Sequence, residues 1–324
     1  MRRLHGWLLV LVLISAAGYP RPASATFSIV ACEAEGGTCG VAVATNNLAV
    51  GASVCYAEAG VGALVSQFET NPRYGPDGLR WLADGLDAQA TLARLLADDG
   101  NFEGLGIGFR QVGIVRAQGQ GAVHTGEAVL ASPWAGSRVG PHYTIQGNGL
   151  AGEAVVLAME AAFLNARGPL AERLVAALTA GQRAGGQATG TLSAAVLVRT
   201  PQGWPFDIDL RVDADEAPVA SLNRLLDLHY ARQAIIRAER LARQGETDQA
   251  WTAVAEALHR GARWDRVWRR AARLAIALDE PARALEYLGV FMALNPAWAR
   301  SEIEEARYAP LHDNPLFRSW QERP

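Results

Sequence analysis

A threonine that follows a small-residue cleavage motif could act as a nucleophile with its own α-amine as the base. Ala23 and Ala25 occupy the small-residue positions of an A-x-A signal-peptidase site, so cleavage there would make Thr26 the new N-terminus. A free α-amine has a pKa of about 7.7–8.0, so it can accept the hydroxyl proton at physiological pH. This pair is sufficient for amide hydrolysis. The alternative is that Thr26 is only the first residue of a β-strand.

Two further residues are candidates for supporting this nucleophile. Asn148 lies between two glycines and could donate its side-chain amide to a developing oxyanion, or could occupy a left-handed turn. Ser193 begins a predicted strand, where its hydroxyl could orient the α-amine or have a purely structural role. Asn148 and Ser193 are therefore candidate catalytic residues beside Thr26.

Three polar residues are candidates for binding a substrate. Gln67 and Asn71 bracket a loop that follows a predicted strand, and both could line a pocket. Arg110, together with the adjacent Gln111, could bind a substrate carboxylate, because a guanidinium group recognises carboxylates through two parallel hydrogen bonds. The chain has no histidine and cysteine cluster at metal-ligand spacing and no phosphate-binding loop, so we expect neither a metal nor a cofactor.

Composition excludes several classes of function. The 324-residue chain contains no lysine, which rules out a catalytic lysine, and its formal net charge is −3. A mildly acidic protein is a poor nucleic-acid binder. Residues 1–25 read as a signal peptide, with an apolar run that is short for a membrane span. We therefore expect a periplasmic or secreted protein with no membrane attachment after cleavage.

The three cysteines limit the disulfides that the chain can form. Cys32 and Cys39 flank a predicted hairpin turn and could face one another across two strands, which makes them the candidate pair. An odd number of cysteines leaves at least one, such as Cys55, without a partner in the chain.

Periodicity and turn residues predict the elements that must position these groups. The predicted order is strands, a helix, strands, two helices and a strand pair, which is an α+β arrangement of two sheets with helices packed outside them. We expect strands at 26–32, 40–44, 48–56, 60–67, 110–117, 121–125, 142–147, 192–198 and 206–212, and helices at 77–96, 152–166 and 169–180.

Residues 222–324 show almost no strand pattern and form a separate predicted region. Small and apolar residues recur every 34 positions, as at Ala250 and Ala284, which is the tetratricopeptide repeat length. We therefore predict a domain at 26–221 followed by a helical-repeat domain at 222–324 that packs on the first domain or on a protein partner. An ordinary helical bundle with coincidental spacing is the alternative.

Motifs throughout the first region resemble a known bacterial family. They include T-F-S-I-V-A at 26–31, G-V-A-V-A at 40–44, N-P-R-Y-G at 71–75, Q-G-N at 146–148 and D-L-R-V-D at 209–213. Together they resemble the domain of unknown function 1028, placed in the N-terminal-nucleophile (Ntn) hydrolase superfamily. The resemblance implies a four-layer αββα sandwich in residues 26–221 and an N-terminal nucleophile at Thr26.

These observations lead to two functional hypotheses. The first is an exported N-terminal-threonine amidohydrolase that acts on a small amide, peptide or acylated amine. The second is a non-catalytic binding or assembly module that holds a protein partner through its helical tail. The sequence leaves the oligomeric state open, so an oligomer is compatible with both.

Overall fold

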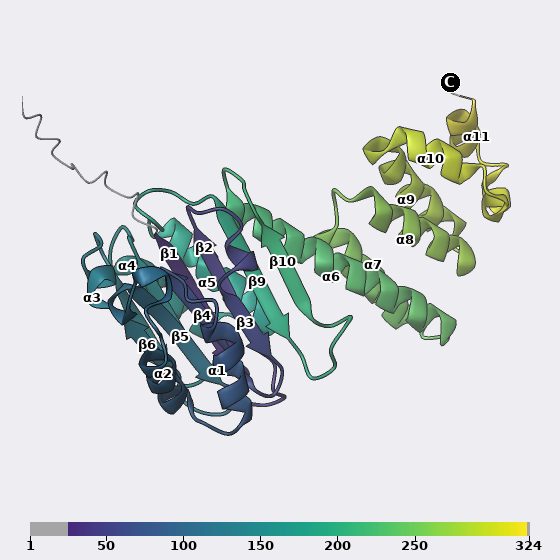
Figure 1. Ribbon diagram of the computed structural model, residues 1–324. Coiled ribbons are helices and arrows are strands. Elements are labelled where there is room, and N and C mark those ends of the chain that lie inside the picture. The colour runs from purple at the N-terminus through teal and green to yellow at the C-terminus, as the bar shows by residue number, and fades with distance from the viewer. Residues whose placement is uncertain (1–24, 323–324) are drawn as a thin grey trace, which may run out of the picture.

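The protein consists of two antiparallel β-sheets, helices on their outer faces and a C-terminal helical region (Figure 1). The computed structural model describes residues 25–322, so the candidate signal peptide lies outside the described residues except for Ala25. This mixed α/β architecture confirms the predicted order of strands and helices at the level of two sheets and a helical tail. Within residues 25–322, no helix is both long and apolar enough to cross a bilayer.

The larger sheet has six strands in the order β10-β9-β2-β1-β8-β7. Its central hairpin joins β1 to β2 in a register that pairs Thr26 with Thr45 at one end and Cys32 with Cys39 at the other. Strand β8 flanks β1 and places Asn148 beside Thr26. The bounds are β1 (Thr26–Cys32), β2 (Cys39–Thr45), β7 (Gly136–Gly140), β8 (Tyr143–Asn148), β9 (Ser193–Arg199) and β10 (Ile208–Val212).

The smaller sheet has four strands in the order β3-β4-β5-β6. Valines and alanines of both sheets form an apolar core between them, which includes Val30, Val43, Val65 and Val115. The bounds are β3 (Cys55–Glu58), β4 (Gly62–Phe68), β5 (Arg110–Arg116) and β6 (Ala122–Thr125).

Helices cover the outer face of each sheet. Helices α4 (Ala154–Asn165) and α5 (Leu170–Arg183) bury Met159, Phe163 and Leu174 against the larger sheet. Helices α1 (Tyr74–Ala83) and α2 (Ala88–Ala97) bury Leu82 and Leu95 against the smaller one. Short helical segments complete this part: α3 (Glu127–Leu130), η1 (Val50–Ala52), η2 (Phe102–Gly104) and η3 (Ile107–Phe109).

The single helix predicted at 77–96 is wrong, because the chain forms α1 and α2 there. Gly85 lies between them with φ of +101°, a conformation that interrupts a helix and that glycine tolerates well. The side chain of Asp87 then accepts a hydrogen bond from the backbone N–H of Ala90 and caps the second helix. The strand predicted at 48–56 is also wrong in its first half, where η1 forms instead.

The C-terminal region consists of helical hairpins. Helix α6 (Pro218–Arg243) pairs with α7 (Thr247–Arg260), and α8 (Asp265–Ala277) pairs with α9 (Pro281–Leu294). The turns repeat at the predicted spacing of 34, since Gly245 and Asp279 both have positive φ. The chain ends with α10 (Pro296–Ile303), η4 (Ala306–Leu311) and α11 (Pro315–Gln321).

Helix α6 joins this region to the sandwich. Leu222 and Leu226 belong to the core under the larger sheet, whereas Ala234 and Ala238 of the same helix belong to the core of the hairpins. The predicted boundary between residues 221 and 222 therefore falls inside a continuous helix.

Candidate active site

Thr26 lies at the end of β1, between the ends of its two neighbouring strands. Register places Thr45 of β2 on one side and Asn148 of β8 on the other. All three residues are buried, and Thr26 is 4% exposed. The position at the end of an inner strand explains why backbone and side-chain groups of three strands converge on one threonine.

Two hydroxyl groups meet at this point. The Oγ1 atoms of Thr26 and Thr45 are 3.1 Å apart. The hydroxyl of Thr45 also donates a hydrogen bond of 2.7 Å to the carbonyl oxygen of Ala25, the residue that precedes the candidate nucleophile. Thr45 therefore contacts both the hydroxyl of Thr26 and the carbonyl of the bond that precedes it.

The side chain of Asn148 faces the backbone nitrogen of Thr26. The Thr26 N–H donates to Asn148 Oδ1 at 3.1 Å, and Asn148 Nδ2 donates to Gln111 Oε1 at 2.8 Å. The N–H of Thr26 needs an acceptor, so this orientation of the amide satisfies both groups. Asn148 is thus adjacent to Thr26, but the atom it presents accepts a hydrogen bond from the backbone N–H of Thr26, whereas the sequence suggested an oxyanion donor.

Gln111 of β5 fixes the orientation of its neighbours. Its Oε1 accepts from both Asn148 and Gln67, the latter at 2.7 Å, while its Nε2 donates to the Gly147 carbonyl at 3.0 Å. The residue is fully buried. A buried amide with all these partners holds the two sheets together in one arrangement.

Gln67 extends the same network to the carbonyl group of Thr26. Its Nε2 lies 3.4 Å from the Thr26 carbonyl oxygen, and its Oε1 accepts from Ser28 at 2.6 Å. Ser28 in turn accepts from Gln146 Nε2. Gly113 makes room for that glutamine, because a Cβ there would lie 2.1 Å from Gln146 Oε1.

A small pocket opens beside Thr26. It has a volume of about 60 Å³ and is lined by residues that include Thr45, Gln67 and Thr70. Ala25 fills the adjoining space: it is fully buried, and a Cβ on Gly149 would lie 2.5 Å from its side chain. The space next to Thr26 is therefore occupied by the residue that precedes it.

Ser193 positions the wall of this pocket and does not contact Thr26. Its hydroxyl donates to the Asn47 carbonyl at 2.6 Å and accepts from the Val50 N–H at 3.1 Å. Asn47 and Val50 both line the pocket. Ser193 thus fastens the loop after β2 to the start of β9, which differs from the predicted contact with the α-amine.

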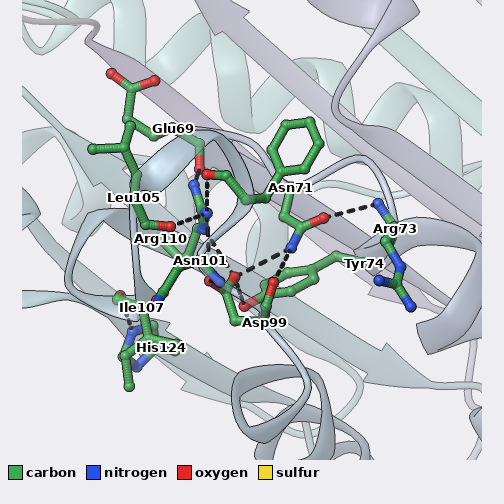
Figure 2. Close-up of polar contacts among 11 residues, drawn as sticks. Glu69, Asn71, Arg73, Tyr74, Asp99, Asn101, Leu105, Ile107, Arg110 and His124 are labelled. Atoms are coloured by element: carbon green, nitrogen blue, oxygen red, sulfur yellow. Dashed lines mark hydrogen bonds and ion pairs between the residues drawn. The ribbon is translucent and has the colours of Figure 1, made fainter.

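Arg110 and Asn71 form a second buried cluster, shown in Figure 2. Arg110 is 1% exposed; its Nε donates to Asp99 Oδ2 at 3.0 Å and its Nη1 to the Glu69 carbonyl at 2.9 Å. Asn71 donates to the same aspartate, and so does the Tyr74 hydroxyl at 2.7 Å. The structure does not bring these two candidates to Thr26, and a substrate carboxylate would have to displace Asp99 from Arg110.

The cluster stabilises the ionised form of Asp99. Burial alone would raise the pKa of this carboxyl, but hydrogen bonds from Arg110, Tyr74 and Asn71 outweigh burial and lower its pKa. Burial and the hydrogen bond to Asp99 raise the pKa of Tyr74. The charged pair ties the loop around residue 102 to β5, because Arg110 also donates to the carbonyls of Phe102 and Leu105.

The cysteines are divided between a disulfide and a half-buried thiol. Cys32 and Cys39 form a disulfide at the closed end of the β1–β2 hairpin. Cys55 is the free cysteine, and burial followed by the charge of Asp209 raises the pKa of its thiol to about 12. Within residues 25–322, no group of three histidine, cysteine or acidic side chains could hold a metal ion.

The sequence did not point to Thr45, and it pointed to Gln111 only as a neighbour of Arg110 and not as a partner of Asn148. The first could have been found, because a hairpin that pairs Cys32 with Cys39 must also pair Thr26 with Thr45. No sequence pattern predicts the contact of Gln111 with Asn148, because it joins two different sheets and depends on how they pack.

Comparison with known proteins agrees with this two-sheet architecture. Residues 26–222 match the model of a family of unknown function, DUF1028, and the chain belongs to that family. The crystal structure of protein SPO2555 from Silicibacter pomeroyi, of the same family, is similar with a TM-score of 0.56 and 31% sequence identity. The similarity covers 63% of this chain and 85% of that one. No curated protein matches.

Proposed function

We propose that the protein is an exported N-terminal-threonine amidohydrolase of the Ntn-hydrolase type. The observation that carries the proposal is the acceptor placed at the Thr26 nitrogen, where Asn148 Oδ1 lies at 3.1 Å and is held by Gln111. The family match also begins at Thr26. The layered order of helices, sheet, sheet and helices supports an αββα sandwich of the kind that carries such nucleophiles.

Signal-peptide cleavage after Ala25 would convert the Thr26 amide into a primary amine. Asn148 would then accept one amine hydrogen and direct the nitrogen lone pair toward the threonine hydroxyl. Loss of Ala25 would also enlarge the pocket and release the Thr45 hydroxyl from the carbonyl that it now contacts. Cleavage on export would in this way create the α-amine base, enlarge the pocket for a substrate and free the Thr45 hydroxyl as a donor.

In the proposed reaction, the amine accepts the proton of Thr26 Oγ1 as the oxygen attacks the amide carbon of the substrate. The freed Thr45 hydroxyl donates to the developing oxyanion. The protonated α-amine then gives its proton to the leaving amine, and an ester on Thr26 remains. Water, activated by the same amine, hydrolyses the ester and releases the acid. The substrate would be a small amide, peptide or acylated amine, and no cofactor takes part.

The test combines N-terminal sequencing of the exported protein with hydrolysis of a panel of acyl-amide substrates. We expect a mature N-terminus at Thr26, activity that is lost in Thr26→Ala and activity that is partly kept in Thr26→Ser. A different N-terminus, or equal activity in Thr26→Ala, would overturn the proposal.

A second candidate function is a binding or assembly module that uses a tetratricopeptide-like tail. Supporting it, the hairpins α6–α7 and α8–α9 repeat at 34 positions, with positive φ at both Gly245 and Asp279. The first hairpin also packs on the sandwich, where Arg260 forms an ion pair of 2.7 Å with Glu172 of α5. Partner capture that persists in Thr26→Ala, together with an inert Thr26, would favour this function.

A further inference from the structure

A second pocket lies far from Thr26 in the fold, where the β9–β10 connection meets helix α6. Its volume is about 530 Å³, which is within the range of small-molecule sites. One wall is the segment 204–206, whose Trp204 is 82% exposed and whose Phe206 is 52% exposed. The opposite wall comes from α6 and includes Ile236, which is 44% exposed. Two exposed aromatic side chains thus face an apolar position on a helix.

One hydrogen bond joins the two walls, and a second orders the side chains of α6. Gln233 Nε2 donates to the Pro205 carbonyl at 3.2 Å and lies 2.9 Å from His229 Nε2. Burial, followed by the charge of Arg232, lowers the pKa of His229, so its neutral ring can accept that hydrogen bond. The pocket is therefore preorganised on its α6 side.

The basic residues of the pocket are only partly neutralised. Arg232 and Arg240, both on α6, have no ion pair or side-chain hydrogen bond with any residue from 25 to 322, whereas Arg237 pairs with Glu256. Two exposed guanidinium groups with no acidic partner therefore lie along one side of the aromatic wall.

The two acidic residues of the pocket offset these arginines only in part. Asp207 accepts hydrogen bonds from the backbone N–H and the hydroxyl of Thr200, at 2.8 and 3.1 Å. Asp209 forms an ion pair of 3.3 Å with Arg199 on the adjacent strand. Asp207 keeps its charge because its partners are neutral, so Arg232 and Arg240 against this one carboxylate leave the pocket with a net positive charge.

We propose that this pocket binds a small carboxylate with an aromatic or branched apolar body. The apolar body would pack against Trp204, Phe206 and Ile236, where it buries exposed aromatic surface. The carboxylate would pair with Arg232 or Arg240, since guanidinium groups bind carboxylates through two hydrogen bonds. The site is independent of the proposed hydrolysis, because none of its residues contacts Thr26 or its network.

Isothermal titration calorimetry with the Thr26→Ala chain tests this site without interference from hydrolysis. The probes are 2-naphthoate, 3-phenylpropionate and the neutral analogue 2-naphthamide. We expect saturable binding of the carboxylates, with 2-naphthamide at least tenfold weaker than 2-naphthoate. The double variant Arg232→Gln/Arg240→Gln and the single variant Trp204→Ala should each weaken 2-naphthoate at least tenfold. These side chains are exposed, so the variants should fold, which circular dichroism checks.

Arg243→Gln is the matched control. Arg243 is also an exposed arginine of α6 without an ion pair among the described residues, but it does not line the pocket. It should leave the affinity for 2-naphthoate unchanged. The proposal is overturned if neither carboxylate binds saturably, if 2-naphthamide binds as tightly as 2-naphthoate, or if Arg243→Gln weakens binding as much as the double variant.

Discussion

The hydroxyl oxygens of Thr26 and Thr45 lie 3.1 Å apart across the β1–β2 hairpin. The disulfide between Cys32 and Cys39 closes the same hairpin at its other end, in the register that pairs the two threonines. A covalent link at one end of the ladder therefore secures the alignment of two hydroxyl groups at the other.

Replacing Thr45 by valine tests the role of its hydroxyl. The two side chains have nearly the same shape, so Thr45→Val removes a donor from the site and leaves a buried methyl group. We expect kcat for amide hydrolysis to fall by about 10²-fold, in the range seen for loss of one oxyanion donor, with little change in KM. Ser53→Ala, which also lines the pocket but does not contact Thr26, should keep kcat within about twofold under steady-state conditions.

Replacing Asn148 by aspartate tests its contact with the amine. A carboxylate beside the α-amine favours the protonated, inactive form and so raises the pKa of the base. The acidic limb of the pH–rate profile should move to higher pH, and activity should recover at alkaline pH. Asn46→Asp, at a partly exposed residue whose side-chain amide donates to the Thr189 hydroxyl, is the control and should leave the profile in place. An unshifted profile in Asn148→Asp would contradict the assigned contact.

The Arg110–Asp99 pair predicts a large effect on stability. Asp99→Asn would leave a guanidinium that is 1% exposed without its counter-charge, which costs about 3–5 kcal/mol of unfolding free energy. Asp98→Asn is a neighbouring control, because its carboxylate is 58% exposed and lies 3.8 Å from Arg94. It should change stability by less than about 1 kcal/mol. Urea unfolding measures both, and similar losses in the two variants would disprove the assignment.

The same aspartate predicts how stability depends on pH. The pKa of Asp99 is lowered in the folded state, so the unfolded chain binds a proton more readily than the native one. Its stabilising contribution is complete above the unfolded pKa of 3.8 and disappears as the pH falls through the lower folded value. Unfolding at several pH values from 2 to 6 should therefore show a steeper acid loss in the wild type than in Asp99→Asn.

Cys55 should resist thiol reagents in the native protein. Burial raises the pKa of its thiol to about 12, so almost no thiolate is present at pH 8. We expect a chromogenic disulfide reagent to label no cysteine in the native, oxidised protein and one in the unfolded protein. Labelling of the native protein at the rate of a free thiol would contradict this.

The sequence alone supports the general architecture and the location of the nucleophile candidate, because both depend on local patterns. Alternating and apolar runs define strands such as β1 and β9, and the hairpin turn sets which residues face Thr26. Arg110 shows where local patterns fail: an arginine next to a polar residue resembles a ligand-binding group, yet folding brings it against Asp99. The contact partners of Gln111 likewise depend on the packing of two sheets, which no single segment encodes.

Two other differences between the predicted and the observed elements, the break between α1 and α2 and the unpredicted strand β7, have local causes. Helix α1 ends at Asp84 and Gly85, and Asp87 caps the start of α2. The sequence nevertheless predicts one continuous helix, because the leucines on both sides keep helical spacing. Strand β7 has exposed residues and two glycines, so it lacks the apolar alternation that identifies strands, and it pairs at the sheet edge beside β8.

Helix α6 is a single continuous helix that contributes to two hydrophobic cores. This limits where the chain can be cut into separately folding parts. Cutting the chain at residue 222, where the family match ends, would remove Leu226 from the core under the larger sheet. The hairpins also have no hinge loop at this junction, because the chain from Pro218 to Arg243 is helical throughout. Because α6 contributes side chains to both cores, the two regions should unfold in one transition.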